Sequence, residues 1–122
     1  MMSDRQERIV KNIEIGFCVI NKMLQDLEGS LDRIPIVTIL IDHDDKLRPI
    51  YPSEEEVGEE FVERLEGLIK DLRPKVIASC EPVDSSEHDG LILIRDVDSD
   101  EYTLFKHNLH SKFSEGWLEV FD

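Results

Sequence analysis

The sequence has few of the residues that build disulfide-stapled, phosphate-binding or membrane-spanning proteins. Its two cysteines, Cys18 and Cys80, have no CxxC spacing, so we expect two buried, reduced thiols rather than a disulfide framework. The six glycines are scattered singly, which gives no glycine-rich phosphate loop. No apolar run approaches the roughly 20 residues of a membrane span, and residues 1–5 lack a signal-peptide core. We therefore expect a cytoplasmic protein without membrane contact.

Positive charge is also scarce. The chain has 14 lysines and arginines against 28 aspartates and glutamates, a formal net charge of −14. A surface this acidic repels phosphate backbones and anionic lipids, which argues against direct binding of nucleic acid or membrane. Residues 54–101 hold 16 acidic and five basic side chains, so this part of the chain carries 11 of the 14 excess negative charges. A concentrated field of this sign attracts basic partners.

The length and patterning indicate a single α+β domain over residues 1–122. A chain of this length buries about two thirds of its unfolded surface, and 40% of its residues are hydrophobic, so a core without staples is expected. Two amphipathic helices are predicted, at about residues 4–27 and 54–72, packed on a mostly antiparallel sheet of five or six strands. The predicted strands lie at residues 34–41, 46–51, 75–80, 91–94, 102–107 and 117–121.

The first predicted helix carries an apolar stripe. It begins at Ser3, a serine N-cap followed three residues later by Gln6, which is the pattern of a capping box. Apolar side chains then recur at alternating spacings of three and four residues. Such a stripe packs either on the domain's own sheet or, because a seven-residue repeat lets two helices pack knobs into holes, along a homodimer seam. The residues of the stripe are Val10, Ile13, Phe17, Ile20, Leu24 and Leu27.

The second predicted helix has the strongest local signal in the chain. Ser53 is a serine N-cap with Glu56 three residues on, so the helix is expected to begin at about residue 54. Negative charge in its first turn complements the positive end of the helix dipole. Pro74 ends the helix, because the residue before a proline is pushed out of the α region.

Two strands are expected to be covered on both faces. Residues 34–41 and 91–94 are continuous apolar runs without the polar alternation of a half-exposed strand. Both faces of the sheet therefore need cover. Either the two helices lie on opposite faces, or a second subunit covers one of them, which leaves a homodimer open as an interpretation.

An acidic tetrad follows the first apolar strand, and it consists of Asp42, His43, Asp44 and Asp45. Carboxylates hold hard divalent cations, and an imidazole adds a nitrogen ligand for a transition metal. A solvated hairpin turn is the simpler interpretation, since aspartate tolerates turn geometry. The apolar strand with Asp42 and Asp44 resembles the first motif of haloacid-dehalogenase-type phosphatases, but Lys46 stands where that family has threonine or valine, and the later motifs have no room in 122 residues.

Two other patterns resemble metal sites but are incomplete. Residues 96–101 have the alternating aspartates of a calcium loop, but Glu101 occupies the position of its glycine and His107 that of its bidentate glutamate. His107 and His110 have the spacing of two ligands on one helix face, yet no second ligand pair accompanies them. The sequence therefore gives no reason to expect a resident metal or cofactor.

Excess negative charge without a catalytic motif favours a binding protein over an enzyme. Immunity proteins against nuclease toxins and phage inhibitors of defence nucleases are roles of this kind, in which an acidic face blocks a basic protein partner. The alternative is a small metal-dependent hydrolase or nucleotide-binding domain that uses the acidic tetrad. The binding hypothesis requires the acidic residues to gather on one outward patch. Those expected to contact the partner are Glu54, Glu55, Glu59, Glu60, Asp84, Glu87, Asp89, Asp96, Asp98, Asp100 and Glu101.

Overall fold

The N-terminal helix, α1 (Asp4–Asp26), begins at the predicted serine cap. The backbone N–H of Gln6 donates to Ser3 Oγ at 3.2 Å, and the backbone N–H of Ser3 donates to Gln6 Oε1 at 3.0 Å, so both halves of the capping box are present. These contacts are seen in a computed structural model, which describes residues 3–56 and 58–120. Val57 and Phe121, expected in the second helix and the last strand, lie outside the described residues.

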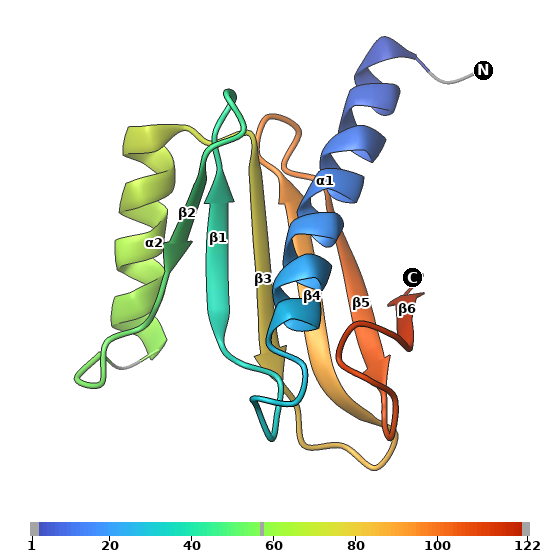
Figure 1. Cartoon of the computed structure of the whole chain (residues 1–122). Helices are drawn as coiled ribbons and strands as arrows, with labels where there is room; N and C mark the ends of the chain where they lie inside the picture. The colour runs from blue at the N-terminus through green and yellow to red at the C-terminus, as the bar shows by residue number, and fades with distance from the viewer. Residues whose placement is uncertain (1–2, 57, 121–122) are drawn as a thin grey trace.

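Six strands form one open antiparallel sheet in the order β2-β1-β3-β4-β5-β6 (Figure 1). Together with the two helices, this confirms the predicted α+β class and the six-stranded form of the sheet. The acidic tetrad is the turn of the β1–β2 hairpin, as the simpler interpretation had it. The strands are β1 (Val37–Ile41), β2 (Leu47–Ile50), β3 (Val76–Pro82), β4 (His88–Asp96), β5 (Tyr102–Asn108) and β6 (Trp117–Val120).

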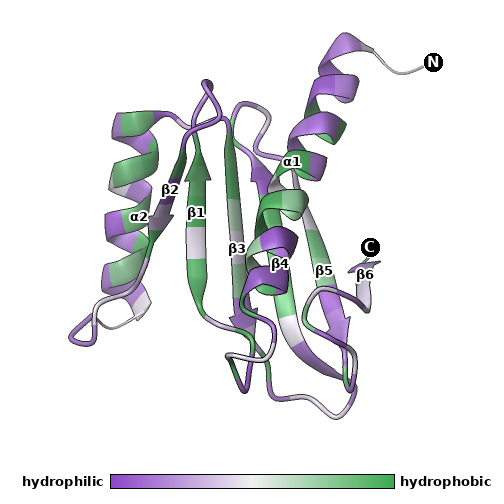
Figure 2. Ribbon diagram, viewed as in Figure 1, coloured by the Kyte–Doolittle hydropathy of each residue, from purple (hydrophilic) through white to green (hydrophobic). Residues whose placement is uncertain are grey.

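The core lies between α1 and the middle of the sheet. Ile20 and Leu24 of α1 have no exposed surface, and they pack in one cluster with the side chains of β1, β3 and β4 that point toward the helix. Figure 2 shows β1 as hydrophobic along almost its whole length. The closest approach is at Gly16, where an added Cβ would lie 2.5 Å from Ile94 Cγ2 and 3.0 Å from Val76 Cγ1. Glycine at this position lets the helix sit close to the sheet.

The apolar stripe of α1 packs largely on the chain's own sheet, which is the first of the two interpretations of this stripe. Ile20 and Leu24 are buried in the core, and the ring centroid of Phe17 lies 4.6 Å from that of Phe105 in β5. Ile13 also packs against the core, and Leu27 is half-buried. Of the six residues, Val10 alone is exposed, at 43%.

The second helix, α2 (Gly58–Leu72), covers part of the opposite face, which we call the far face. Thr38 and Leu40 of β1 point away from α1, since side chains alternate along a strand, yet they are only 6% and 0% exposed. Glu66 of α2 lines a groove with Leu93 of β4, which also points to the far face. One of the two predicted alternatives, helices on opposite faces, therefore accounts for the burial of β1. Within the described residues, neither helix is long and apolar enough to cross a membrane.

The second helix begins later than its capping signal predicts. Residues 54 and 55 form a turn, and α2 is helical from Gly58. The predicted pair Ser53 and Glu56 closes that turn instead, because the N–H of Ser53 donates to Glu56 Oε1 at 2.8 Å. Arg64 of α2 donates to the same carboxylate, from its Nη2 to Oε1 at 2.9 Å and from its Nε to Oε2 at 3.0 Å. Glu56 therefore closes a loop rather than opening a helix.

The sequence predicts that residues 34–41 and 91–94 form strands that are covered on both faces. Only the first of these strands, β1, is covered on both faces. All five residues of β1 are buried. In β4, Ile92 and Ile94 face α1 and have no exposed surface, whereas Leu93 on the far face is 38% exposed. The expectation for residues 91–94 is wrong, because α2 covers the β1 side of the far face and leaves the β4 side open.

Candidate partner-binding surface

The acidic residues predicted to contact a partner lie in three separate groups. Glu54, Glu55, Glu59 and Glu60 surround the start of α2; Asp84, Glu87 and Asp89 lie at the β3–β4 connection; Asp96, Asp98, Asp100 and Glu101 lie at the β4–β5 turn. The second and third groups are at opposite ends of β4, which its nine residues place about 26 Å apart (Figure 1). The structure does not gather the eleven residues into the single patch that the binding hypothesis expected.

Asp96 is not available to a partner, because it is buried inside the protein. Its side chain is 1% exposed and accepts hydrogen bonds from Asn12 Nδ2 at 2.6 Å, Ser99 N at 3.0 Å and Ser99 Oγ at 2.6 Å. Burial disfavours the charged form, but the hydrogen bonds from Asn12 and Ser99 together hold the pKa of this carboxyl below its ordinary value. Asp96 is a structural anion that joins α1 to the β4–β5 turn.

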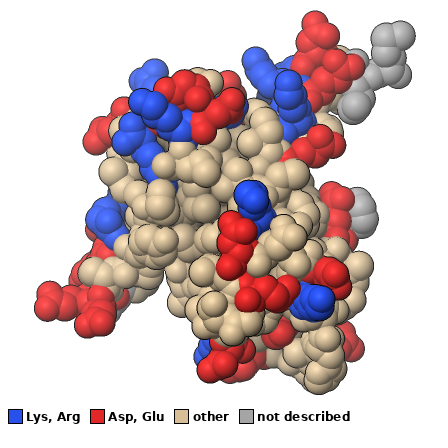
Figure 3. Space-filling view, in the orientation of Figure 1, with Lys and Arg blue, Asp and Glu red and all other residues tan. Residues whose placement is uncertain are grey.

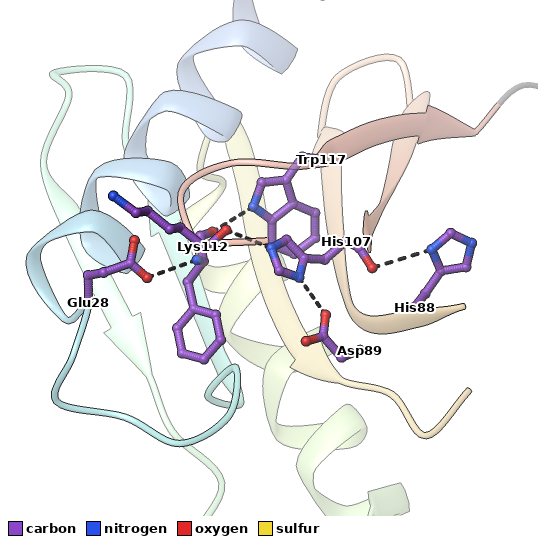
Figure 4. Close-up of polar contacts among 7 residues, drawn as sticks. Glu28, His88, Asp89, His107, Lys112 and Trp117 are labelled. Carbon is purple, nitrogen blue, oxygen red and sulfur yellow. Dashed lines mark hydrogen bonds and ion pairs between the residues drawn. The ribbon is translucent and has the colours of Figure 1, made fainter. Parts of the chain in front are cut away.

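Asp89 is also engaged within the protein, through His107 (Figure 4). The His107 ring has no exposed surface, and its Nδ1 faces Asp89 Oδ1 while its Nε2 lies 2.7 Å from the backbone oxygen of Lys112. A carbonyl oxygen only accepts, so Nε2 donates to Lys112, and the Asp89 carboxylate faces the other ring nitrogen. Trp117 packs beside the ring, with centroids 4.8 Å apart.

This arrangement removes His107 as a metal ligand or general base. Either role needs a ring nitrogen that faces an accessible site, and both nitrogens of His107 are occupied inside the protein. His107 is therefore not free to act as a ligand together with His110. The imidazole fastens the loop between β5 and β6 instead, and Glu28 binds the same loop by accepting from Phe113 N at 2.9 Å.

Each carboxylate of the acidic tetrad faces a cation of the same chain. Asp42 lies 2.9 Å from Arg48 Nε, Asp44 lies 3.8 Å from Lys46 Nζ, and Asp45 pairs with Lys75. The hydrogen bond and the charge of Lys75 hold the pKa of the exposed Asp45 carboxyl below its ordinary value. In the described part of the chain, no three histidine, cysteine or acidic side chains are grouped so as to hold a metal ion.

The two cysteines differ in exposure, which corrects the expectation of two buried thiols. Cys80 is 3% exposed, and burial raises the pKa of its thiol to about 12. Cys18 is exposed on α1. Because the thiolate is the reactive form, we expect a thiol reagent such as Ellman's reagent to modify Cys18 in the native protein and Cys80 only after unfolding. Peptide mapping after native labelling checks this, and a Cys18→Ser variant that still reacts quickly would contradict it.

The turn before α2 and the helix itself carry a high density of acidic side chains. Residues 54–72 carry eight acidic and two basic side chains, and no residue of α2 is buried. In Figure 3 a red group lies at the lower left, where Figure 1 places the turn before α2. Glu54, Glu55, Glu59 and Glu60 are exposed, and within residues 3–56 and 58–120 none of these four forms an ion pair.

Beside α2 lies an apolar surface that the sequence patterns did not predict. We call it the open floor: the far-face side chains of β4, β5 and β6. Leu93, Tyr102 and Leu118 are 38%, 63% and 52% exposed there. The alternation of Leu118 and Val120 with Trp117 and Glu119 was the available signal, but it does not show which face lacks cover. By register the open floor has three rows: Leu91, Lys106 and Leu118; Leu93, Leu104 and Val120; Arg95 and Tyr102.

The acidic α2 surface and the open floor are thus neighbours, and they meet in a groove of about 370 Å³ lined by Glu66, Leu93, Arg95, Asp100 and Tyr102. An acidic wall beside an apolar floor is suited to binding a partner that is both basic and amphipathic. No protein-family model matches the chain, and comparison with curated proteins and with solved structures gives no match either. The functional argument therefore rests on these surfaces.

Proposed function

We propose that the protein is a cytoplasmic, non-catalytic binding protein that blocks a basic protein partner, in the manner of an immunity protein or inhibitor, for example of a nuclease. The observation that carries this proposal is the charge of residues 54–72, which include eight acidic side chains and only two basic ones. We assign the contact to this surface and not to all eleven predicted residues, because Asp96 is buried and Asp89 is engaged by His107.

This surface can attract a basic partner because its glutamates are exposed. Glu54, Glu55, Glu59 and Glu60 are exposed and form no ion pair within the described residues, so a basic partner gains attraction without breaking an internal ion pair. Glu56 differs, because Arg64 already binds it and, as the main cause, lowers the pKa of its carboxyl. Long-range attraction between exposed charges falls with ionic strength, so binding should weaken with salt.

Charge reversal on α2 tests the proposal. The tagged protein would capture its partner from the native host at low salt, and the purified partner would be titrated by calorimetry. We expect Glu59→Lys with Glu60→Lys to weaken binding by about tenfold or more, since four units of charge change at the contact, whereas raising the salt should weaken the wild type.

The matched control is Asp4→Lys with Glu7→Lys. These two residues lie in the first turn of α1, as Glu59 and Glu60 lie in the first turn of α2, so both double variants change the net charge and the helix termini alike. The control should bind within about twofold of the wild type after correction for its general charge. A partner that is not basic, or an equal effect of both double variants, would exclude the α2 surface as the contact.

A further inference from the structure

The far face of the sheet has room for one more helix. Three strands at about 4.8 Å spacing make the open floor roughly 14 Å wide, and a helix with side chains is about 10 Å across. The seven residues of β5 are about 23 Å long, the length of a helix of about 15 residues, whereas the four residues of β6 span about 13 Å, so the helix would rest on all three strands along part of its length. Because α2 occupies the β1 side of this face, a second helix on the open floor would complete its cover.

The floor itself is apolar, and the wall beside it is acidic. Leucines and Val120 fill its two complete rows, and Lys106 is the half-buried exception. Arg95 is already balanced, since its Nε lies 2.7 Å from Asp100 Oδ1, although not in hydrogen-bond geometry. On the α2 side, Val62 is 54% exposed and Glu66 lines the groove that joins wall and floor. A bound helix would therefore contact an apolar floor and, along one side, the acidic wall of α2.

We propose that an amphipathic helix of the basic partner docks on the open floor alongside α2, with its apolar side on the leucines and its lysines or arginines toward Glu66. This inference rests on the proposed function and names the element by which the partner binds. β4 and β5 are paired on both sides, and among the floor strands the four-residue β6 is at the edge of the sheet, so most of the floor offers side chains rather than free backbone groups, which favours a helix over an added strand.

Charge distinguishes this occupant from a second copy of the chain. Each copy carries a net charge of −14 and would bring its own acidic α2 toward the other, so like charges would oppose a face-to-face dimer. A basic helix gains attraction at the same place. The open floor is therefore assigned to the partner and not to a homodimer.

The test uses two leucines of equal exposure on opposite faces. Leu118 in β6 is 52% exposed on the open floor, and Leu47 in β2 is 51% exposed on the α1 face. Both lie in four-residue strands at an edge of the sheet. We expect Leu118→Glu to weaken binding of the captured partner by about tenfold or more, because docking would bury the new carboxylate, and Leu47→Glu to leave binding within about twofold. Circular dichroism and thermal melting confirm that both variants fold.

A defined probe gives an independent readout. A peptide of about 15 residues with leucine at helical spacing and lysine elsewhere is titrated against the full-length protein, with a scrambled peptide of the same composition as control. We expect the first peptide to gain helical ellipticity on binding, to perturb the NMR methyl signals of Leu93 and Leu118, and to bind more weakly to Leu118→Glu. Equal binding of the scrambled peptide would show attraction by charge alone and would overturn the docking proposal.

The outcomes separate this inference from the proposed function. If the Glu59 and Glu60 reversals weaken the partner but Leu118→Glu does not, the acidic contact stands and the helix on the open floor is wrong. If neither weakens it, both proposals fail. If light scattering shows a wild-type dimer that Leu118→Glu converts to a monomer, a second copy occupies the floor and the assignment to a basic helix is wrong.

Discussion

Replacing Asp96 with alanine is expected to lower the free energy of unfolding by about 3 kcal/mol at neutral pH. The substitution removes a buried carboxylate that accepts from Asn12 and twice from Ser99. Hydrogen bonds to a charged group contribute about 1.5–3 kcal/mol each, and the amide of Asn12, 8% exposed, loses the partner of its Nδ2. Urea unfolding followed by circular dichroism measures the change. Asp98→Ala in the same turn is the control, because Asp98 is exposed and should change stability by less than about 0.5 kcal/mol.

The stabilisation by Asp96 should depend on pH in a defined direction. Its folded pKa is lowered, so the folded state holds the charged form more firmly than the unfolded chain does. The contribution is complete above the unfolded value of about 3.9, and it is lost as the pH falls through the lower, folded value. The stability difference between wild type and Asp96→Ala should therefore be constant from about pH 7 to pH 5 and narrow below about pH 4. A difference that grows on acidification would contradict this account.

Local signals in the sequence predicted the elements that local contacts build. The capping box of Ser3 and Gln6 spans three residues, and it begins α1 as expected. The turn at residues 42–45 follows from the turn preference of aspartate, and it joins β1 to β2. The same kind of signal predicted the start of α2 too early, because the contact between Ser53 and Glu56 forms but closes a turn before the helix, where Arg64, eight residues on, binds the same carboxylate.

The sequence predicts that the candidate site is acidic, but it does not predict which acidic residues lie on the surface. Composition alone located the negative charge between residues 54 and 101, and the exposed glutamates of α2 agree with it. The sequence could not show that Asp96 turns inward, because its partner Asn12 is 84 residues away. It also could not show that Leu93 is exposed, because a continuous apolar run is the same whether or not a helix happens to cover it. Both facts depend on which elements pack together.

Replacing His107 with phenylalanine is the second change with a large expected effect. Phenylalanine keeps an aromatic ring against Trp117 and Phe113 but donates no hydrogen bond. The backbone oxygen of Lys112 and the carboxylate of Asp89 then lose the group that they share. A buried polar group left without a partner costs about 1–3 kcal/mol, and two groups lose one here, of which Asp89 is partly exposed, so we expect a loss of about 2–3 kcal/mol.

The loss should be concentrated in the loop between β5 and β6, because His107 fastens that loop to β4 through Lys112 and Asp89 (Figure 4). Hydrogen exchange should therefore quicken at residues 109–116 more than in β1 or β3. His88→Phe is the matched control, since the half-buried His88 makes one contact, 3.3 Å from Nδ1 to the backbone oxygen of His107, and its loss should cost about 1 kcal/mol or less. Equal destabilisation by the two histidine variants would contradict this account, because it would mean that the contacts of the His107 ring with Asp89 and Lys112 contribute no more than the single hydrogen bond of His88.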